Sequence, residues 1–283
     1  MVTIKNQALT VTINELGSEM QSIVKNNEEF LWNGRPEVWS GRAPLLFPIC
    51  GGLKENKYLY NGKEYTLPKH GYARNQLFEV EAVKEDEVVF LHKSNEETKK
   101  GFPFDYELRV IYRLKENAIE TEYRVQNLGA DTMYFSIGSH EAYYTPEGIE
   151  DYDIVFSENV SLDTNMLCGN LIDTATMPIL KDSRVLPLYE KYFSIDALIF
   201  RRCPTRNATL RNRKTGKAIT VDFPDATSLL LWHMPNSPYM CIEPWLGFPD
   251  IIGSSYDITE KEGIIPLNAG KVFSNIHTIT INS

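Results

Sequence analysis

The strongest constraint on this chain is a period of two in its apolar residues, the repeat of a β-strand with one buried face. The clearest stretch covers residues 106–125. Apolar and charged side chains alternate through its first half, Lys115-Glu116-Asn117 interrupts them, and the alternation then resumes. The pattern predicts a hairpin with one face on a core and the other face charged.

Similar hairpins are indicated along most of the chain. Asn61-Gly62, the strongest two-residue turn signal, separates two apolar stretches. We expect further turns at residues 26–27, 85–86 and 214–217, and strands near residues 9–13, 229–232, 240–242 and 273–281. No window of a dozen residues has helical periodicity, and residues 186–193 could hold one short helical turn.

Neither an internal repeat nor a linker rich in Pro, Gly and Ser divides the chain. We therefore expect residues 1–283 to form a single all-β domain. Its predicted architecture is a large antiparallel β-sandwich with a concave face. Aromatic residues are frequent, at 11%, and filling such a sandwich accounts for most of them.

Charge and processing signals narrow the class of protein. The sequence has 29 Lys and Arg residues against 38 Asp and Glu residues, a net charge of −9, so we expect neither nucleic acid nor a membrane as a partner. The N-terminus has no apolar segment of a signal peptide, and no apolar run approaches the roughly 20 residues that span a bilayer. Four cysteines without a Cys-x-x-Cys pair read as free, mostly buried thiols. These features predict a cytoplasmic protein.

Four stretches break the alternation with residues that carry chemistry. Arg42 lies beside a Pro-punctuated apolar run, where it would pair either with a structural carboxylate or with a ligand. His70-Gly71 indicates an imidazole on a tight turn whose backbone approaches another group closely. His140 follows an apolar strand that ends at Gly138, and it and Glu141 point to opposite faces if the strand continues.

Glu243 is the fourth of these positions. It lies between Ile242 and Pro244 inside an apolar strand, where its pKa should be raised unless cations or donors hold it ionised. A salt-bridged core Glu is the plain alternative, and a functional carboxylate is favoured because Glu is rare in such a run.

The remaining histidines carry weaker signals. His92 reads as a solvated strand end, His277 as a surface residue, and His233 could line the same cleft as the others. No His pair has the spacing typical of a local metal-ligand set, and we expect no metal.

The motifs Gly-Arg-Ala-Pro-Leu-Leu-Phe-Pro-Ile (41–49), His-Gly-Tyr-Ala-Arg (70–74), Ile-Gly-Ser-His (137–140), Asp-Ala-Leu-Ile-Phe (196–200) and Cys-Ile-Glu-Pro-Trp (241–245) occur in this order. With them the chain resembles the aldose 1-epimerase, or galactose mutarotase-like, family and most closely its LacX-like bacterial branch. The resemblance covers nearly the whole length and implies an antiparallel β-sandwich with an open sugar-binding groove.

The resemblance also implies roles for the residues of these motifs. Glu243 would be the general base and His140 the general acid of anomer interconversion, with His70 assisting beside the ring oxygen. We expect a small-molecule aldose, a hexose or hexose phosphate, as the partner, no cofactor, and a monomer or homodimer. The expected substrate-binding residues are Arg42, Arg74, Asp196 and Trp245, of which Arg74 would support His70 or contact an anionic substituent.

Three alternatives stay open. A glycosidase would need two carboxylates flanking the bond, Glu243 with Asp196 or Asp250, and would leave the histidines without roles. A sugar-binding or regulatory protein could keep the groove without turnover. An epimerase acting on a hexose 6-phosphate could use Arg42 and Arg74 to meet the phosphate.

Overall fold

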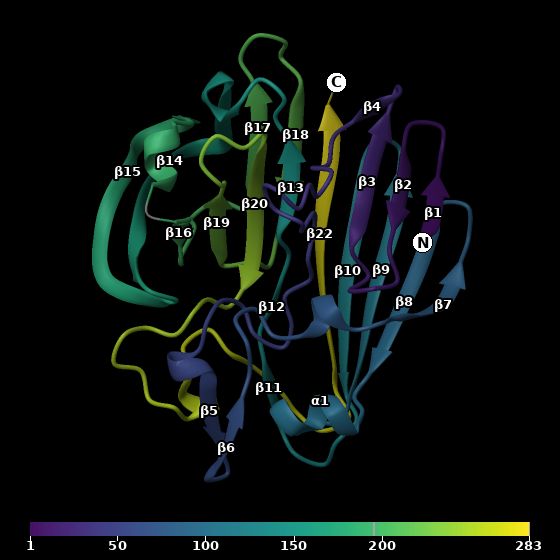
Figure 1. Ribbon diagram of the computed structural model, residues 1–283, viewed down its shortest axis with the longest axis vertical. Coiled ribbons are helices and arrows are strands. Elements are labelled where there is room, and N and C mark those ends of the chain that lie inside the picture. The colour runs from purple at the N-terminus through teal and green to yellow at the C-terminus, as the bar shows by residue number, and fades with distance from the viewer. Residues whose placement is uncertain (195, 283) are drawn as a thin grey trace.

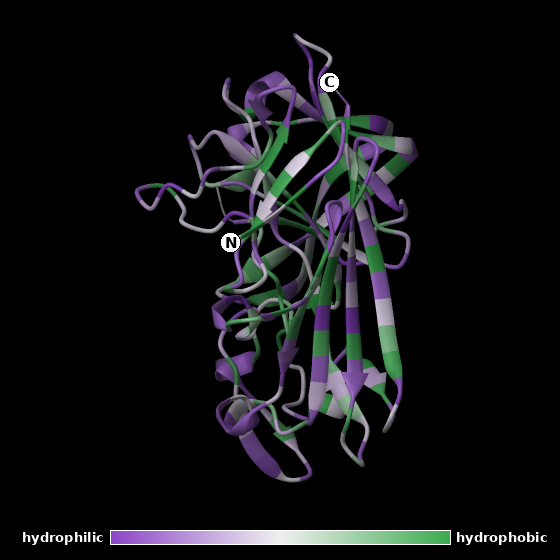
Figure 2. Ribbon diagram, turned by 90° about the vertical axis from the view of Figure 1, so that its right-hand side faces the viewer, coloured by the Kyte–Doolittle hydropathy of each residue, from purple (hydrophilic) through white to green (hydrophobic). Residues whose placement is uncertain are grey.

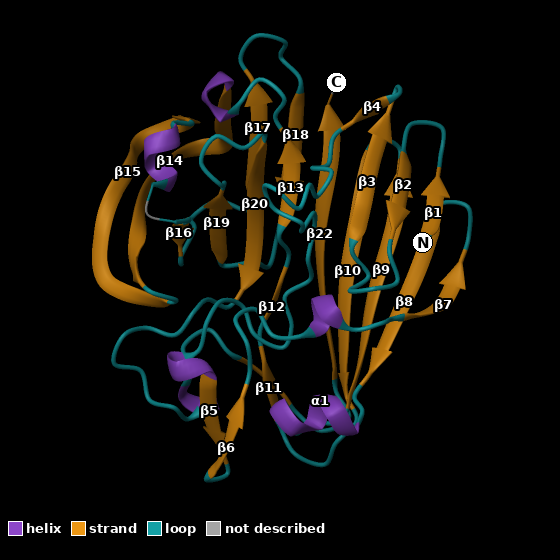
Figure 3. Cartoon of the chain, viewed as in Figure 1, coloured by secondary structure: helices purple, strands orange, loops and turns teal. Residues whose placement is uncertain are grey.

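The computed structural model describes residues 1–194 and 196–282. Strands dominate it, and the long ones run side by side in large antiparallel sheets (Figures 1 and 3), which confirms the all-β prediction. The largest sheet has nine strands, in the order β15 (Leu171–Pro187), β14 (Tyr152–Cys168), β17 (Asn207–Asn212), β18 (Ala218–Asp222), β22 (Val272–Asn282), β10 (Ala118–Asn127), β9 (Tyr106–Lys115), β8 (Glu87–Lys93) and β7 (Glu79–Val83).

Two smaller sheets pack against this nine-stranded sheet. One consists of β1 (Val2–Lys5), β2 (Thr10–Ile13), β3 (Met20–Lys25) and β4 (Glu28–Glu29). The other has five strands, β12 (Ile137–Gly138), β20 (Tyr239–Leu246), β19 (Ser228–Trp232) and β16 (Leu198–Phe200), with β13 (Glu141–Tyr144) also paired to β20. Both lie over the large sheet in Figure 1, and apolar residues of all three belong to one buried cluster.

The remaining elements are short. Two-stranded ribbons join β5 (Lys57–Tyr60) to β6 (Lys63–Thr66) and β11 (Met133–Phe135) to β21 (Ile265–Leu267). Helix α1 covers Glu96–Gly101, and 3₁₀ turns cover Lys54–Asn56, Ala73–Asn75, Ile149–Asp151, Glu190–Phe193 and Ile258–Glu260. No helix in the described part of the chain is long and apolar enough to cross a membrane.

The period of two determines which face of each long strand is buried. In β9 and β10 alternate residues such as Leu108 and Ile119 are fully buried, and bands of opposite hydropathy follow one another along the strands in Figure 2. The outward face is charged: Arg113 contacts Glu87, Glu120 and Glu122 at 2.6, 3.2 and 2.9 Å. The predicted hairpin over residues 106–125 is confirmed, with its turn between Lys115 and Ala118.

Candidate active site

Glu243 owes its position to the two different faces of β20. Met240 and Ile242 point into the main core with the β19 residues Leu229 and Leu231. Glu243 alternates with them and therefore points to the opposite face of the five-stranded sheet. The side chains on that face are buried as well, so β20 is buried on both sides and its sequence is apolar except for Glu243.

His140 is brought to Glu243 by strand pairing. The strands on either side of it both pair with β20, Gly138 opposite Trp245 and Glu141 opposite Ile242. The result is a distance of 3.4 Å between His140 Nε2 and Glu243 Oε2. Both side chains are buried, and their neighbour Glu141 points the other way, as the alternation predicts, to an interior contact with His277.

Burial also sets the protonation of this pair. Loss of water raises the pKa of the Glu243 carboxyl well above its ordinary value, although the charge of Lys69 opposes the shift. Loss of water lowers the pKa of the His140 imidazole to about 3. At a pH above the pKa of His140 and below the raised pKa of Glu243, the pair holds one proton, on the Glu243 carboxyl, and one base and one acid together need one proton.

His70 presents a defined nitrogen to the same space. Its Nδ1 accepts a hydrogen bond from the Gly51 N–H at 3.1 Å, so in the neutral ring the proton is on Nε2. Burial lowers the pKa of His70 well below its ordinary value, which keeps the ring neutral near pH 7. The following Gly71 has φ 68°, and a Cβ there would lie 2.2 Å from the Phe47 carbonyl oxygen, so the predicted close backbone approach is confirmed.

These groups line one cavity of about 350 Å³, large enough for a monosaccharide. Six of the seven predicted site residues line it: His70, Arg74, His140, Asp196, Glu243 and Trp245. Aromatic rings form much of its wall, because Trp39 stacks on His140 with ring centres 5.1 Å apart and Trp232 meets the same imidazole edge-on at 5.5 Å. Trp245 is anchored by a hydrogen bond from its Nε1 to the Ser139 carbonyl oxygen at 2.9 Å.

Two predicted polar residues lie elsewhere. The Arg42 guanidinium donates to the Gln21 carbonyl oxygen at 2.5 Å and does not line the cavity, so its partner in the structure is a backbone carbonyl. Asp250, weighed as a second glycosidase carboxylate, forms an ion pair of 2.7 Å with Lys261 and also lies outside the cavity lining.

The three remaining histidines, His92, His233 and His277, do not lie where the sequence analysis placed them. His92 is buried with its Nδ1 3.1 Å from the Tyr106 hydroxyl, so its reading as a solvated end was wrong. His277 is also buried, 3.1 Å from Glu141, and its reading as a surface residue was wrong. His233 contacts Glu190 at 2.9 Å and does not line the cavity.

The cavity contains residues to which the sequence analysis gave no role. Lys69, Asn170 and Trp39 line it. Lys69 directly precedes His70 in the sequence, and this adjacency could have identified it as a site residue. Asn170 lies in the tip of the β14–β15 hairpin, which no sequence pattern places near the site.

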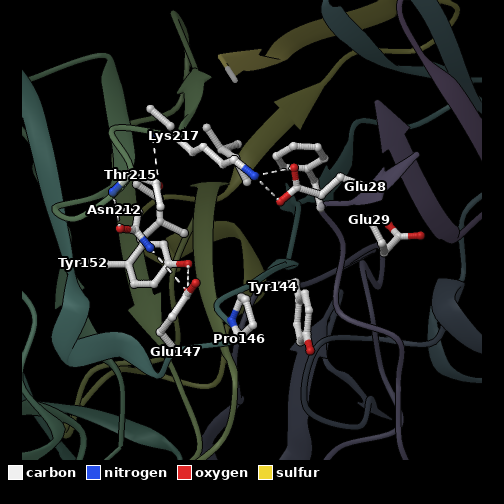
Figure 4. Close-up of a pocket in the computed structure, with 13 residues that line it drawn as sticks. Glu28, Glu29, Tyr144, Pro146, Glu147, Tyr152, Asn212, Thr215 and Lys217 are labelled. Carbon is white, nitrogen blue, oxygen red and sulfur yellow. Dashed lines mark hydrogen bonds and ion pairs between the residues drawn. The ribbon is translucent and has the colours of Figure 1, made fainter. Parts of the chain in front are cut away.

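A second cavity of about 190 Å³ lies between β4 and the β17–β18 turn (Figure 4). Lys217 contacts Glu28 at 2.5 Å, and Glu147 accepts hydrogen bonds from Tyr152 at 2.8 Å and Asn212 at 3.3 Å. These polar groups therefore already have partners within the protein.

Comparison with known proteins agrees with this geometry. Residues 1–264 match the family profile described as aldose 1-epimerase. The chain is 36% identical to the plasmid-encoded protein LacX of Lactococcus lactis subsp. lactis over 288 aligned positions, which cover 95% of this chain and 96% of LacX. The chromosomal LacX of the same organism has the same identity and coverage.

Solved structures give the same result for the fold. A galactose mutarotase related enzyme from Lactobacillus acidophilus is 35% identical and superposes with a TM-score of 0.95, covering 100% of this chain and 97% of that one. A galactose mutarotase-like protein from Lactobacillus casei is 29% identical, with a TM-score of 0.93 over the full length of both chains.

Proposed function

The chain belongs to the aldose 1-epimerase family, and on this basis we propose that it interconverts the α and β anomers of a hexose. The observation that carries the proposal is the contact between His140 and Glu243, two buried groups that share one titrating proton at the wall of a sugar-sized cavity. Ring opening of a hemiacetal needs a base at the C1 hydroxyl and an acid at the ring oxygen.

The shifted pKa values place the single proton of the pair on Glu243, so the proposed cycle begins when this proton passes to His140 across their 3.4 Å contact and leaves Glu243 ionised and His140 protonated. Glu243 takes the proton of the C1 hydroxyl while His140 protonates the ring oxygen, and the C1–ring oxygen bond breaks to give the open aldehyde. Rotation about the C1–C2 bond then presents the other face of the carbonyl. The same two groups return their protons in the reverse sense as the ring closes, so the pair ends with the single proton with which it began.

The other lining residues would bind and orient the sugar. The proton on His70 Nε2 makes this nitrogen a donor toward the ring oxygen or a neighbouring hydroxyl. Asp196 offers a carboxylate to hydroxyl groups, and the flat faces of Trp39 and Trp245 suit the C–H surface of a pyranose.

Polarimetry tests the proposal. Freshly dissolved α-D-glucose or α-D-galactose should lose its excess optical rotation faster with the protein than in buffer. A wild-type protein that never exceeds the buffer rate, with free or 6-phosphorylated hexoses, would contradict the proposal. Sugar binding without acceleration would instead select the non-catalytic sugar-binding alternative.

A hexose 6-phosphate is the second candidate substrate, and a specific observation favours it. Lys69 and Arg74 both line the cavity, and across residues 1–194 and 196–282 neither has a carboxylate within 4.0 Å; Arg74 donates only to the Lys69 carbonyl oxygen at 3.0 Å. Two such cations suit a phosphate better than a neutral hydroxymethyl group.

Lys69→Met separates the two substrates. A charge-assisted hydrogen bond contributes about 1.5–3 kcal/mol, so losing it should reduce kcat/KM for the phosphate ester by roughly 10- to 100-fold, and by much less for the free hexose. Lys63→Met, on the surface ribbon, is the matched control. Equal reduction for both substrates would argue against a phosphate at this end of the cavity.

A further inference from the structure

The acid/base pair has a third neighbour that the proposed cycle does not use. Cys241 lies two residues before Glu243 on β20, so both side chains point to the same face of the sheet. Sγ of Cys241, a ring nitrogen of His140 and a carboxylate oxygen of Glu243 all lie within 4.8 Å of one another. All three residues are buried.

The chemistry of this set is that of a metal site. Thiolate, imidazole and carboxylate are the three protein ligands that Zn²⁺ uses, at bond lengths of roughly 2.0–2.3 Å. His140 Nδ1 is buried and, among the described residues, has no hydrogen-bond partner, so the imidazole has an uncommitted nitrogen. Cys241 and Glu243 are two residues apart on β20, and His140 lies in the connection between β12 and β13, which both pair with β20. The three donors therefore come together in the fold without forming a local sequence motif.

We propose that His140, Cys241 and Glu243 bind a thiolate-preferring divalent cation, Zn²⁺ or an ion like it, and that this ion inhibits the enzyme. Tetrahedral bonds of the stated lengths place ligand atoms about 3.3–3.8 Å apart, so the donors must move together by about 1 Å. Two protons leave to solvent as the metal bonds form, the Cys241 S–H proton and the single proton held by the His140–Glu243 pair. The cavity is the entry path for the ion because His140 and Glu243 line it.

Inhibition follows because the ion engages the same carboxylate and imidazole that the sugar needs. The binding of the metal is independent of the proposed function, whereas the inhibition rests on it. A thiophilic ion would therefore compete with the sugar for the two reacting groups.

Cobalt is the probe for the binding step, because Co²⁺ bound to a thiolate has a sulfur-to-metal charge-transfer absorption. Metal-free protein is titrated with Co²⁺, and wild-type protein should show this absorption at one equivalent and lose it when Zn²⁺ is added. Cys241→Ala and Cys241→Ser should lack it. Cys168→Ser should retain it, and this variant is the matched control because Cys168 is the exposed thiol.

Zn²⁺ inhibition of anomer interconversion is the second readout. The concentration that halves the wild-type rate should rise about tenfold or more in Cys241→Ala, since loss of even an outer-shell partner weakens metal binding 10- to 100-fold. Equal sensitivity of the two proteins, or a Co²⁺ spectrum unchanged by Cys241→Ala and Cys241→Ser, would overturn the proposal. A wild-type protein with the thiolate absorption but no epimerase activity supports the metal site and overturns the proposed function instead.

Discussion

Lys261→Met should destabilise the fold strongly, because Lys261 is half of a buried ion pair beneath the cavity. Its Nζ lies 2.7 Å from Asp250 Oδ1 and donates to the Phe248 carbonyl oxygen at 2.9 Å. The two side chains are only 5% and 6% exposed. Asp250 also accepts from the Lys54 N–H at 2.8 Å, so the pair ties together the segments around Lys54 and Pro249, and Pro249 lines the cavity.

Removing one partner leaves a buried charge without compensation, which costs about 3–5 kcal/mol. The exposed pair between Lys214 and Asp151, at 2.6 Å, is the control, and Lys214→Met should cost about 1 kcal/mol or less. The double variant Lys261→Met/Asp250→Asn removes both charges and keeps an acceptor for the backbone, so it should recover about 1–3 kcal/mol of the loss.

Urea unfolding followed by fluorescence and circular dichroism gives the free energy of unfolding of each variant. A cost of 3–5 kcal/mol should also lower Tm by at least about 6 °C, at roughly 2 °C per kcal/mol for a chain of this size. A loss below about 1 kcal/mol for Lys261→Met, equal to that of Lys214→Met, would refute the argument from burial. A double variant as unstable as the single one would refute the assignment of the cost to the unpaired Asp250.

Two further predictions concern the cavity lined by His140 and Glu243. As pH falls from about 8 to about 5, kcat/KM corrected for the spontaneous reaction should not decline. The pKa of His140 is lowered to about 3, so the pair gains a second proton only in stronger acid. A fall in kcat/KM centred near pH 6.5 would contradict this prediction. Gly71→Ala should cost more than the 1–2 kcal/mol of a left-handed residue and reduce kcat/KM by displacing His70, because its Cβ would lie 2.2 Å from a carbonyl oxygen. Gly62→Ala, with a similar φ of 74° and open space around it, should leave activity unchanged, and equal unfolding free energies for the two variants would rule out the clash.

Alternation predicted those parts of the fold in which one face of a strand is buried and the other is solvated. The strands that it missed depart from that rule. The 17-residue strands β14 and β15 are interrupted by register shifts, and only two residues of β15 are buried, so residues 152–187 have no regular apolar face. A periodicity test does not detect helix α1, because six residues are fewer than two turns. Its sequence signals are the capping box of Asn95 and Thr98, the acidic residues of its first turn and the lysines of its last turn.

The same logic explains the site residues. Glu243 and His140 were identifiable because they are polar residues in apolar stretches of the sequence. In the structure both line a cavity. His277 has the same parity in its strand as the buried Ile279 and Ile281, so alternation itself indicates an interior position, and only the polar side chain argued against it. The partner of Arg42 could not be predicted from residue type alone. A backbone carbonyl accepts a hydrogen bond from a guanidinium as a ligand would, and no sequence pattern distinguishes the two.

The rate of α-D-hexose mutarotation by wild-type protein, Glu243→Gln and His140→Ala, measured side by side, tests the central claim most directly. Each variant removes one end of the proton pair, and general acid or base catalysis contributes about 10²- to 10⁴-fold. We expect the wild type to exceed the buffer rate clearly, and each variant to lose at least about 100-fold in kcat/KM while unfolding cooperatively like the wild type. Folded variants that retain the wild-type rate would contradict the claim that Glu243 and His140 carry the reaction.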